Sequence, residues 1–348
     1  MGSVKNLIVQ EEPERDKPGS GRFVFSDRYS VFDWGEMPDL IPNKGKVLAM
    51  MGGYNFELLE REGVNTHYLG MVEEGESREA VRTEALSSPT NKMAIHLAHK
   101  PVVQESESGY RYEDLSGWNN FLIPLEIVFR NSVPVGSSIR GRYRPDDIGL
   151  ELNEWPEGEV KLETPIVEYS TKLERQDRYL SPEEAFEISG LTDQEFAELG
   201  KIATGVNSHL TAHANTAGFN HLDGKIECIY DRGEILVADV VGTFDENRFS
   251  FNGRQISKEV LRGWYKKQDE NWYESVVAAK EESKKTGLTD WTELVEKPPR
   301  KLDSELKQLV ADLYGAGANR WFGFDLFDAP EISNLMEELD SWEEKTNL

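Results

Sequence analysis

Strand-type patterns dominate the first part of the chain and helix-type patterns dominate the last part. Short apolar or alternating runs, bounded by glycine, proline and polar residues, predict strands over residues 4–10, 22–26, 92–97 and 121–130. The run from Phe121 to Arg130 is the most apolar stretch of the chain and is typical of a buried strand. Because strands and helices do not alternate regularly, the order predicts an α+β fold.

Two helix starts are marked by capping boxes. Ser181 and Glu184 form one, with Pro182 at the first helical position, and Thr192 and Glu195 form the other. Apolar residues recur at helical spacing behind the second box, which predicts a long helix packed on the core. Further helical patterns cover residues 50–62, begin near Ser257, and cover residues 300–314.

The balance of charge limits the classes of partner. Acidic residues number 64 and basic residues 39, so the net charge is −25. Such a surface repels nucleic-acid phosphates and anionic lipid, so we expect neither nucleic acid nor membrane as a partner. The acids are spread along the chain, which favours an adaptation to high salt. The denser stretch over residues 325–344 leaves both a solvated helix and a partner contact open. Separately, a homo-oligomer stays possible.

The expected compartment follows from cysteine content and hydropathy. Cys228 is the single cysteine of the chain, so an intramolecular disulfide is excluded. No run approaches the length of a membrane-spanning helix, and the first residues lack the apolar core of a signal peptide. We therefore expect a cytoplasmic protein.

Residues 224–241 predict a β-hairpin that carries two acids. With residues 231–233 as a three-residue loop, Lys225 lies opposite Asp239, and Glu227 lies diagonal to Asp239 on the same face. Two carboxylates on rigid strands suit Mg²⁺, and the lysine would offset phosphate charge. A plain cross-strand salt bridge is the competing interpretation, and a register shift of one residue would separate the pair.

A cluster of arginines interrupts the acidic chain. Arg130, Arg140, Arg142 and Arg144 lie close together, and residues 131–144 contain no acid. The planar guanidinium group matches phosphate or carboxylate with two parallel hydrogen bonds, so the cluster predicts a site for an anionic ligand. An inter-lobe loop whose arginines pair with surface acids explains the composition equally well.

Four stretches carry motifs in a defined order. They are Asp27–Asp33 followed by Ile41–Gly45, Ile123–Asn131 followed by Gly136 and Ser137, Asp223–Glu227 followed by Ala238 and Asp239, and Ser257–Arg262. In order and spacing they resemble the phosphoribosylaminoimidazole-succinocarboxamide synthase (SAICAR synthetase) family, over about residues 2–267. Four ordered motifs make the resemblance specific.

The resemblance implies a fold and an activity. The fold would be two-lobed and similar to kinases and ATP-grasp enzymes, with a β-rich lobe over residues 1–120, an α+β lobe over residues 121–299 and an acidic helical extension over residues 300–348. The activity would be an ATP- and Mg²⁺-dependent carbon–nitrogen ligase. It would join L-aspartate to 5-amino-1-(5-phosphoribosyl)imidazole-4-carboxylate (CAIR) through an acyl phosphate, giving SAICAR in purine synthesis.

The resemblance also implies roles for single residues. The implied Mg²⁺ ligands are Glu227 and Asp239, and the implied contacts to ATP are Lys5, Leu122, Glu126 and Lys225. The implied contacts to the ribonucleotide are Asp33, Arg130, Ser137 and Arg248. Lys225 and Arg130 would also act in catalysis, and no covalent enzyme nucleophile is implied.

The sequence departs from the family pattern at several points. Ser3 replaces one of two lysines, Cys228 and Ile229 follow the metal-site glutamate, the loop at Pro134 is one residue longer, and Val240 replaces an acid. Two other functions stay open beside the implied one. One is an ATP-dependent amide ligase for another carboxylate or amine, and the other is a kinase-like nucleotide-binding module without ligase activity.

Overall fold

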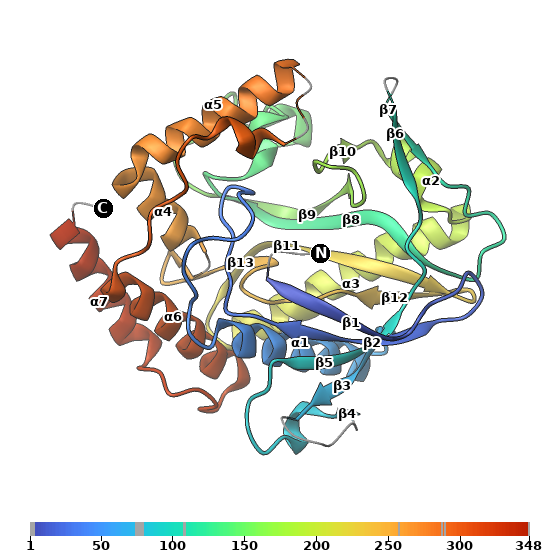
Figure 1. Cartoon of the computed structure of the whole chain (residues 1–348), viewed down its shortest axis with the longest axis horizontal. Helices are drawn as coiled ribbons and strands as arrows, with labels where there is room; N and C mark the ends of the chain where they lie inside the picture. The colour runs from blue at the N-terminus through green and yellow to red at the C-terminus, as the bar shows by residue number, and fades with distance from the viewer. Residues whose placement is uncertain are drawn as a thin grey trace.

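Antiparallel sheets form the centre of the computed structural model, which describes residues 4–73, 80–106, 109–256, 258–286, 288 and 290–346 (Figure 1). A five-stranded sheet has the order β1-β2-β5-β3-β4, with β1 (Lys5–Glu11), β2 (Gly19–Phe25), β3 (Tyr68–Val72), β4 (Ala80–Val81) and β5 (Lys92–Leu97). A two-stranded sheet pairs β6 (Val103–Ser106) with β7 (Gly109–Tyr112).

A seven-stranded sheet carries most of the residues discussed below. Its main path is β10-β9-β8-β11-β13-β14, and β12 also pairs with β11. The strands are β8 (Asn120–Val133), β9 (Val160–Thr171), β10 (Tyr179–Leu180), β11 (Asn220–Asp231), β12 (Glu234–Ala238), β13 (Asn247–Phe251) and β14 (Arg254–Gln255).

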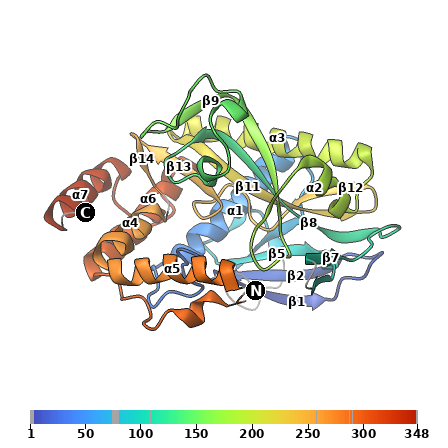
Figure 2. The ribbon, with the colours of Figure 1, turned by 90° about the horizontal axis from the view of Figure 1, so that it is seen from above.

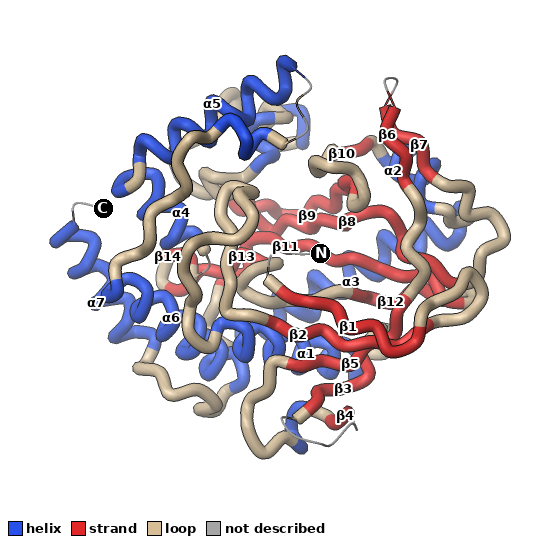
Figure 3. Tube along the Cα trace, viewed as in Figure 1, coloured by secondary structure: helices blue, strands red, loops and turns tan. Residues whose placement is uncertain are grey.

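Helices cover the sheets and form one side of the molecule (Figures 2 and 3). The α-helices are α1 (Lys44–Arg61), α2 (Pro182–Ser189), α3 (Asp193–Thr216), α4 (Glu259–Gln268), α5 (Glu270–Thr286), α6 (Ser304–Phe322) and α7 (Ile332–Thr346), and short 3-10 turns cover Thr83–Ala85, Ser138–Gly141, Asp146–Ile148 and Trp291–Leu294. Helix α1 contacts β2, β3 and β5, α2 and α3 contact β8 and β9, and α6 contacts α1 and α7. Among the described helices, none combines the length and the apolar character needed to cross a bilayer.

Strand β8 gives the large sheet one apolar face and one polar face. Successive side chains of a strand point to opposite faces. From Phe121 to Phe129 the odd-numbered residues of β8 are at most 1% exposed and belong to the same core cluster as buried residues of α3; they are Phe121, Ile123, Leu125, Ile127 and Phe129. The even-numbered residues include Glu126 and Arg130. The sheet therefore buries one apolar face and carries polar side chains, Glu126 and Arg130 among them, on the other face.

The α+β class is confirmed, and most predicted elements are present. The strands predicted over residues 4–10, 22–26, 92–97 and 121–130 correspond to β1, β2, β5 and β8. In both capping boxes the N-cap hydroxyl accepts a hydrogen bond from the glutamate N–H three residues on. Helix α1 begins at Lys44 rather than Met50, because it follows Asn43 in the left-handed conformation (φ 62°) without a side-chain cap that the sequence could reveal. Helix α4 begins at Glu259, and the predicted cap Ser257 lies outside the described residues.

The predicted register of the hairpin is wrong by one residue. Asp231 pairs with Glu234 and Glu227 pairs with Ala238, so the loop contains two residues and not three. Both loop residues have positive φ, 49° at Arg232 and 92° at Gly233, as a two-residue turn of type I′ requires. Arginine rarely adopts this conformation, so the sequence favoured the longer loop.

Candidate active site

Three rows of paired residues cross the polar face of the seven-stranded sheet. Directly paired residues on neighbouring strands point to the same face. The first row is Ser170, Glu126, Glu227 and Ala238; the second is Glu168, Val128 and Lys225; the third is Ile166, Arg130, Asp223 and Arg248. The sheet thus brings together five of the predicted site residues: Glu126, Arg130, Lys225, Glu227 and Arg248.

Asp239 joins Glu227 in spite of the register shift. It follows β12 directly and has a φ of 62°, in the left-handed region, where the chain leaves the regular alternation of the strand. Burial and then the charge of Asp239 raise the pKa of Glu227 to about 7. Burial alone would raise the pKa of Asp239 as well, but Lys5 and Lys172 hold it below its usual value. The two acids therefore influence each other electrostatically, and their role as a metal-binding pair stays a prediction.

Three lysines form ion pairs with Asp239, Glu227 and Glu126. Lys5 Nζ lies 2.8 Å from Asp239, Lys172 Nζ lies 2.5 Å from Glu227, and Lys225 Nζ lies 2.7 Å from Glu126 Oε1. Burial would lower the pKa of Lys225, but the surrounding acids raise it well above its usual value, so this lysine keeps its charge at neutral pH. The side chains of Lys172 and Lys225 are 29% and 32% exposed, so the cluster can be reached from solvent.

Two members of this cluster were not selected from the sequence. Lys172 directly follows β9 and also lies 3.2 Å from Glu126, and Glu246 lies 3.4 Å from Lys225 Nζ. No strand was predicted over β9, so nothing in the sequence placed Lys172 beside β8. A lysine at the end of an alternating strand was the signal that was missed. Ser3, the departure from the family pattern near Lys5, lies outside the described residues.

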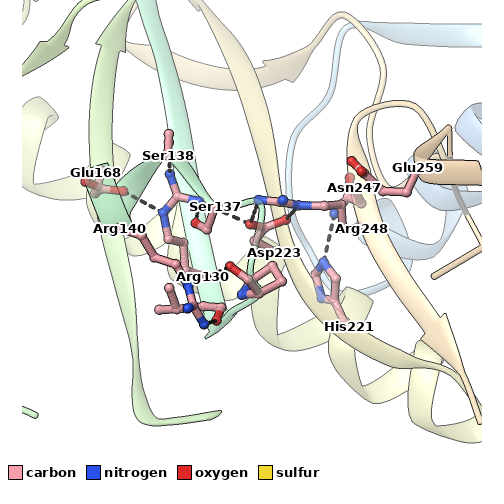
Figure 4. Close-up of polar contacts among 12 residues, drawn as sticks. Arg130, Ser137, Ser138, Arg140, Glu168, His221, Asp223, Asn247, Arg248 and Glu259 are labelled. Carbon is pink, nitrogen blue, oxygen red and sulfur yellow. Dashed lines mark hydrogen bonds and ion pairs between the residues drawn. The ribbon is translucent and has the colours of Figure 1, made fainter. Parts of the chain in front are cut away.

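Arg130 is the centre of a second polar cluster, at the third row (Figure 4). It is 2% exposed, and its guanidinium group donates to Glu168 at 2.6 Å and to Asp223 at 3.1 Å. The same group donates to the side chains of Ser137 (3.2 Å), Ser138 (3.2 Å) and Tyr179 (3.0 Å). Arg248 Nε donates to Asp223 from the opposite side at 2.8 Å. Asp223 therefore holds the two predicted arginines together.

The other arginines of the predicted cluster have separate roles. Arg140 is structural, because it donates to the backbone carbonyls of Val133, Pro134, Pro156 and Gly158. Arg144 is exposed and pairs with a surface aspartate. Arg142 lies 2.7 Å from Glu168 and 3.4 Å from the ring centroid of Tyr179, and its buried Nε and Nη2 atoms have no partner among the described residues. The interpretation as pairing with surface acids thus holds for Arg144, and the anion site stays a prediction for the other arginines.

Leu122 and Asp33 lie at the margins of this face. Leu122 is on the same side of β8 as Glu126, and its N–H donates to the carbonyl of His99 at 2.8 Å. Asp33 lies in an exposed loop and pairs with Lys280 of α5 at 2.6 Å, and within the described residues it has no contact with Arg130. Its charge does reach Asp177, whose pKa is raised by burial and then by the charge of Glu126. Asp33 therefore borders the polar face without joining the arginine cluster.

Comparison with known proteins identifies the family. The family model described as SAICAR synthetase matches residues 14–279. A provisionally named phosphoribosylaminoimidazole-succinocarboxamide synthase of Archaeoglobus fulgidus is 45% identical over 346 residues, which cover 97% of this chain and 98% of that protein. Both matches include β8, β11 and β12, the strands that carry the rows described above.

Solved structures agree in fold. SAICAR-synthase from Saccharomyces cerevisiae, complexed with SAICAR, matches with a TM-score of 0.61 and 21% identity over 93% of each chain. A SAICAR synthetase in complex with ADP matches with a TM-score of 0.54 and 24% identity, over 75% of this chain and 88% of that one. Since the family model covers well over half of the sequence and the archaeal relative nearly all of it, the chain belongs to the SAICAR synthetase family.

Proposed function

We propose that this chain is an ATP-dependent ligase that joins L-aspartate to CAIR and forms SAICAR in purine biosynthesis. The observation that carries the proposal is the polar face of the large sheet, where an acid pair surrounded by lysines and a pair of arginines lie on the same strands in a member of this family. The family relatives solved with ADP and with SAICAR support the same assignment. The two alternatives, another amide ligase or a nucleotide-binding module without ligase activity, are less favoured.

The lysine-rich rows suit the phosphates of ATP. Lys5, Lys172 and Lys225 come from three strands or their ends and converge on neighbouring acids, so their charges are already positioned for an anion. Glu227 and Asp239 fit Mg²⁺, which takes oxygen ligands and completes its shell with phosphate and water. When bound there, the ion would neutralise negative charge on the ATP phosphates.

An apolar surface beside the lysines suits the adenine ring. Lys5 pairs with Phe25 and Leu7 pairs with Phe23, so Lys5, Leu7 and Val9 share one face of β1. Leu7 and Val9 are 37% and 40% exposed there, although both are apolar. The hairpin of β1 and β2 contacts the start of β8, because the carbonyl of Arg15 accepts from the N–H groups of residues 119 and 120. We therefore propose that the adenine ring of ATP binds between Leu7, Val9 and Leu122. This position agrees with the ATP contact that the family resemblance implies for Leu122.

The arginine cluster suits the ribonucleotide. Arg130, Ser137 and Arg248 lie together because Asp223 fixes both guanidinium groups, and a phosphate or carboxylate of the ligand would take over some of the hydrogen bonds that Arg130 now makes to protein side chains. Along β11, Asp223 and Glu227 are four residues apart, or about 13 Å. This spacing lets one end of CAIR bind the arginines while its carboxylate reaches the ATP phosphates. Asp33 lies at the border, where a loop contact to the ribonucleotide fits its position.

The proposed reaction has two steps. An oxygen of the CAIR carboxylate attacks the γ-phosphorus of ATP, the bond to the bridging oxygen breaks, and ADP leaves. The aspartate amine then attacks the acyl phosphate, phosphate leaves with the bonding electrons, and the amine loses a proton as the amide forms. Lys225 and Lys172 would offset charge on the transferring phosphoryl group, and Arg130 and Arg248 would hold the ribonucleotide in line.

An ADP-release assay tests the proposal. We expect sustained release of ADP only when ATP, aspartate and CAIR are all present. We expect Glu227→Ala to fold but to release no ADP. ADP release that does not depend on CAIR would indicate a nucleotide hydrolase instead. Normal turnover by Glu227→Ala would contradict the metal assignment, and a faster reaction with another amine would favour a different amide ligase.

A further inference from the structure

Helix α6 contacts the loop that joins the two halves of the proposed site. We call residues 239–247 the site loop, because they connect the acid Asp239 to Arg248. Helix α6 covers Ser304–Phe322 and lies outside the stretch matched by the family model, which ends at residue 279. The role of this C-terminal segment therefore has to be inferred from its contacts.

The first contact is a buried hydrogen-bond network. The hydroxyl of Tyr314 donates to Asp245 Oδ1 at 2.6 Å, and Lys44 Nζ donates to Asp245 Oδ2 at 2.6 Å. Tyr314 and Lys44 are both 0% exposed. Burial would raise the pKa of Asp245, but the charges of Lys44 and Lys258 and these hydrogen bonds lower it, so Asp245 is an anion held by α1 and α6. The next residue, Glu246, pairs with Lys225 at the proposed phosphate site.

A second chain of hydrogen bonds reaches the site loop from the same helix. Trp321 Nε1 donates to Asn55 Oδ1 at 2.8 Å, and Asn55 Nδ2 donates to the carbonyl of Val241 at 3.1 Å. A third contact is steric, because a Cβ added to Gly317 would lie 2.7 Å from the ring of Phe244. Helix α6 thus touches the site loop, directly or through α1, at Val241, Phe244 and Asp245.

The site loop needs such external support. Asp239 and Gly242 both have positive φ, 62° and 69°, so the chain turns sharply instead of continuing the strand. Within the loop, the N–H groups of Glu246 and Asn247 donate to the hydroxyl and the carbonyl of Thr243, at 3.4 and 2.8 Å, and these bonds order only its last residues. The position of Glu246 therefore depends on Thr243 and on what holds Asp245.

We propose that Tyr314 is a positioning residue for substrate binding. By holding Asp245, it fixes the site loop, and with it Glu246 at Lys225 and Arg248 at Asp223. In this proposal Tyr314 contacts none of the three substrates, and its effect passes through Asp245. This inference rests on the proposed function of the site, and it makes α6 part of the catalytic unit.

The test compares Tyr314→Phe with Tyr68→Phe. Each change removes one buried hydroxyl that donates to a carboxylate, at 2.6 Å to Asp245 and at 2.8 Å to Glu57, but Glu57 also accepts hydrogen bonds from Thr83, which lies outside the site loop. A hydrogen bond to a charged group corresponds to about a tenfold change or more in an equilibrium constant. We expect Tyr314→Phe to raise the KM for CAIR, through Arg248, and the KM for ATP, through Glu246 and Lys225, each by up to about tenfold. We expect Tyr68→Phe to change neither constant.

A measurement without substrates makes the test independent of the proposed function. We expect amide hydrogen exchange over residues 239–248 to speed up in Tyr314→Phe and to stay unchanged in Tyr68→Phe. Unchanged exchange in Tyr314→Phe would overturn the positioning role, whatever the activity. So would equal losses of thermal stability in both variants with the KM for CAIR unaltered. By contrast, an inactive wild type whose site loop loosens in Tyr314→Phe would refute the proposed function and leave the positioning role supported.

Discussion

At the scale of single residues, Glu227 has the most directly testable property. Its pKa is raised to about 7, first by burial and then by the charge of Asp239. Mg²⁺ requires the ionised carboxylate, so the ion must displace a proton below that pH. We expect Mg²⁺ affinity to fall about tenfold per pH unit below pH 7. Because the folded pKa lies above the usual value of 4.5, Glu227 also stabilises the metal-free fold less as the pH rises from about 4.5 through 7.

Calorimetric titration of Mg²⁺ in buffers with different ionisation heats measures the proton that is released. We expect about one proton per ion at pH 6 and close to none at pH 8.5. Glu227→Gln provides the control, since it keeps the shape of the side chain but cannot bind or release the proton. Mg²⁺ binding that is equally tight at pH 6 and pH 8.5 would contradict the role given to Glu227.

The residues found from the sequence are those whose neighbours lie nearby in the chain or in a recognisable motif. Glu227 and Lys225 are two positions apart on one strand, so their shared face follows from strand geometry. Segments that are distant in the sequence meet in the fold and give Lys172, Glu246 and Asp223 their partners. No local pattern specifies which segments meet. Asp223 illustrates the limit, because it lies in a quoted motif, yet only its position between Arg130 and Arg248 explains it.

At the scale of secondary structure, capping chemistry was predictable and unusual backbone conformations were not. The boxes at Ser181 and Thr192 located two helix starts to the residue. The left-handed residues Asn43, Arg232 and Asp239 changed a helix start, a hairpin register and the direction of a side chain. None of the three is a glycine, and L-residues adopt this region too rarely for a sequence to indicate it.

The packing of α6 on the site loop gives a prediction about one element. Gly317 is close to the ring of Phe244, so Gly317→Ala forces the helix and the loop apart. We expect the free energy of unfolding to fall by about 1–3 kcal/mol, as for other overpacked interiors. Gly205→Ala on α3 is the matched control, because an added Cβ meets nothing there within 4 Å. That change should stabilise the helix by about 0.5–1 kcal/mol.

Chemical denaturation of both variants checks this prediction. Unfolding midpoints that move in opposite directions would support close packing between α6 and the site loop. Equal gains in stability would show that the helix has room for a methyl group at Gly317 and would weaken the case for a tight contact.

At the scale of the whole molecule, the α+β class was predictable from the order of patterns, and the arrangement of the strands was not. The seven-stranded sheet places β11 between β8 and β13. In the sequence, β8 ends about ninety residues before β11, and β13 follows the hairpin of β11 and β12. The C-terminal segment was expected as an extension, yet Leu306, Tyr314 and Trp321 of α6 belong to the same core cluster as β8. Hydrophobic periodicity predicts that a helix is buried without specifying its partner. The domain boundaries at residues 120 and 300 therefore stay predictions.

The net charge of −25 gives the last prediction, which concerns the stability of the molecule in salt. Salt has two opposing effects on this protein. It weakens exposed ion pairs, each worth about 0–1 kcal/mol, and it screens the repulsion among 64 acids that only 39 bases can offset. The buried pairs of Arg130 are little affected, because solvent ions do not reach them. Since acids are in excess over the whole sequence, the screening effect is larger, and we expect Tm to rise by about 5 °C or more between 0.1 M and 2 M KCl.

Sucrose at matched osmolality separates screening from general exclusion of solutes. A Tm that is highest at low salt would show that the ion pairs stabilise the fold more than the excess charge destabilises it.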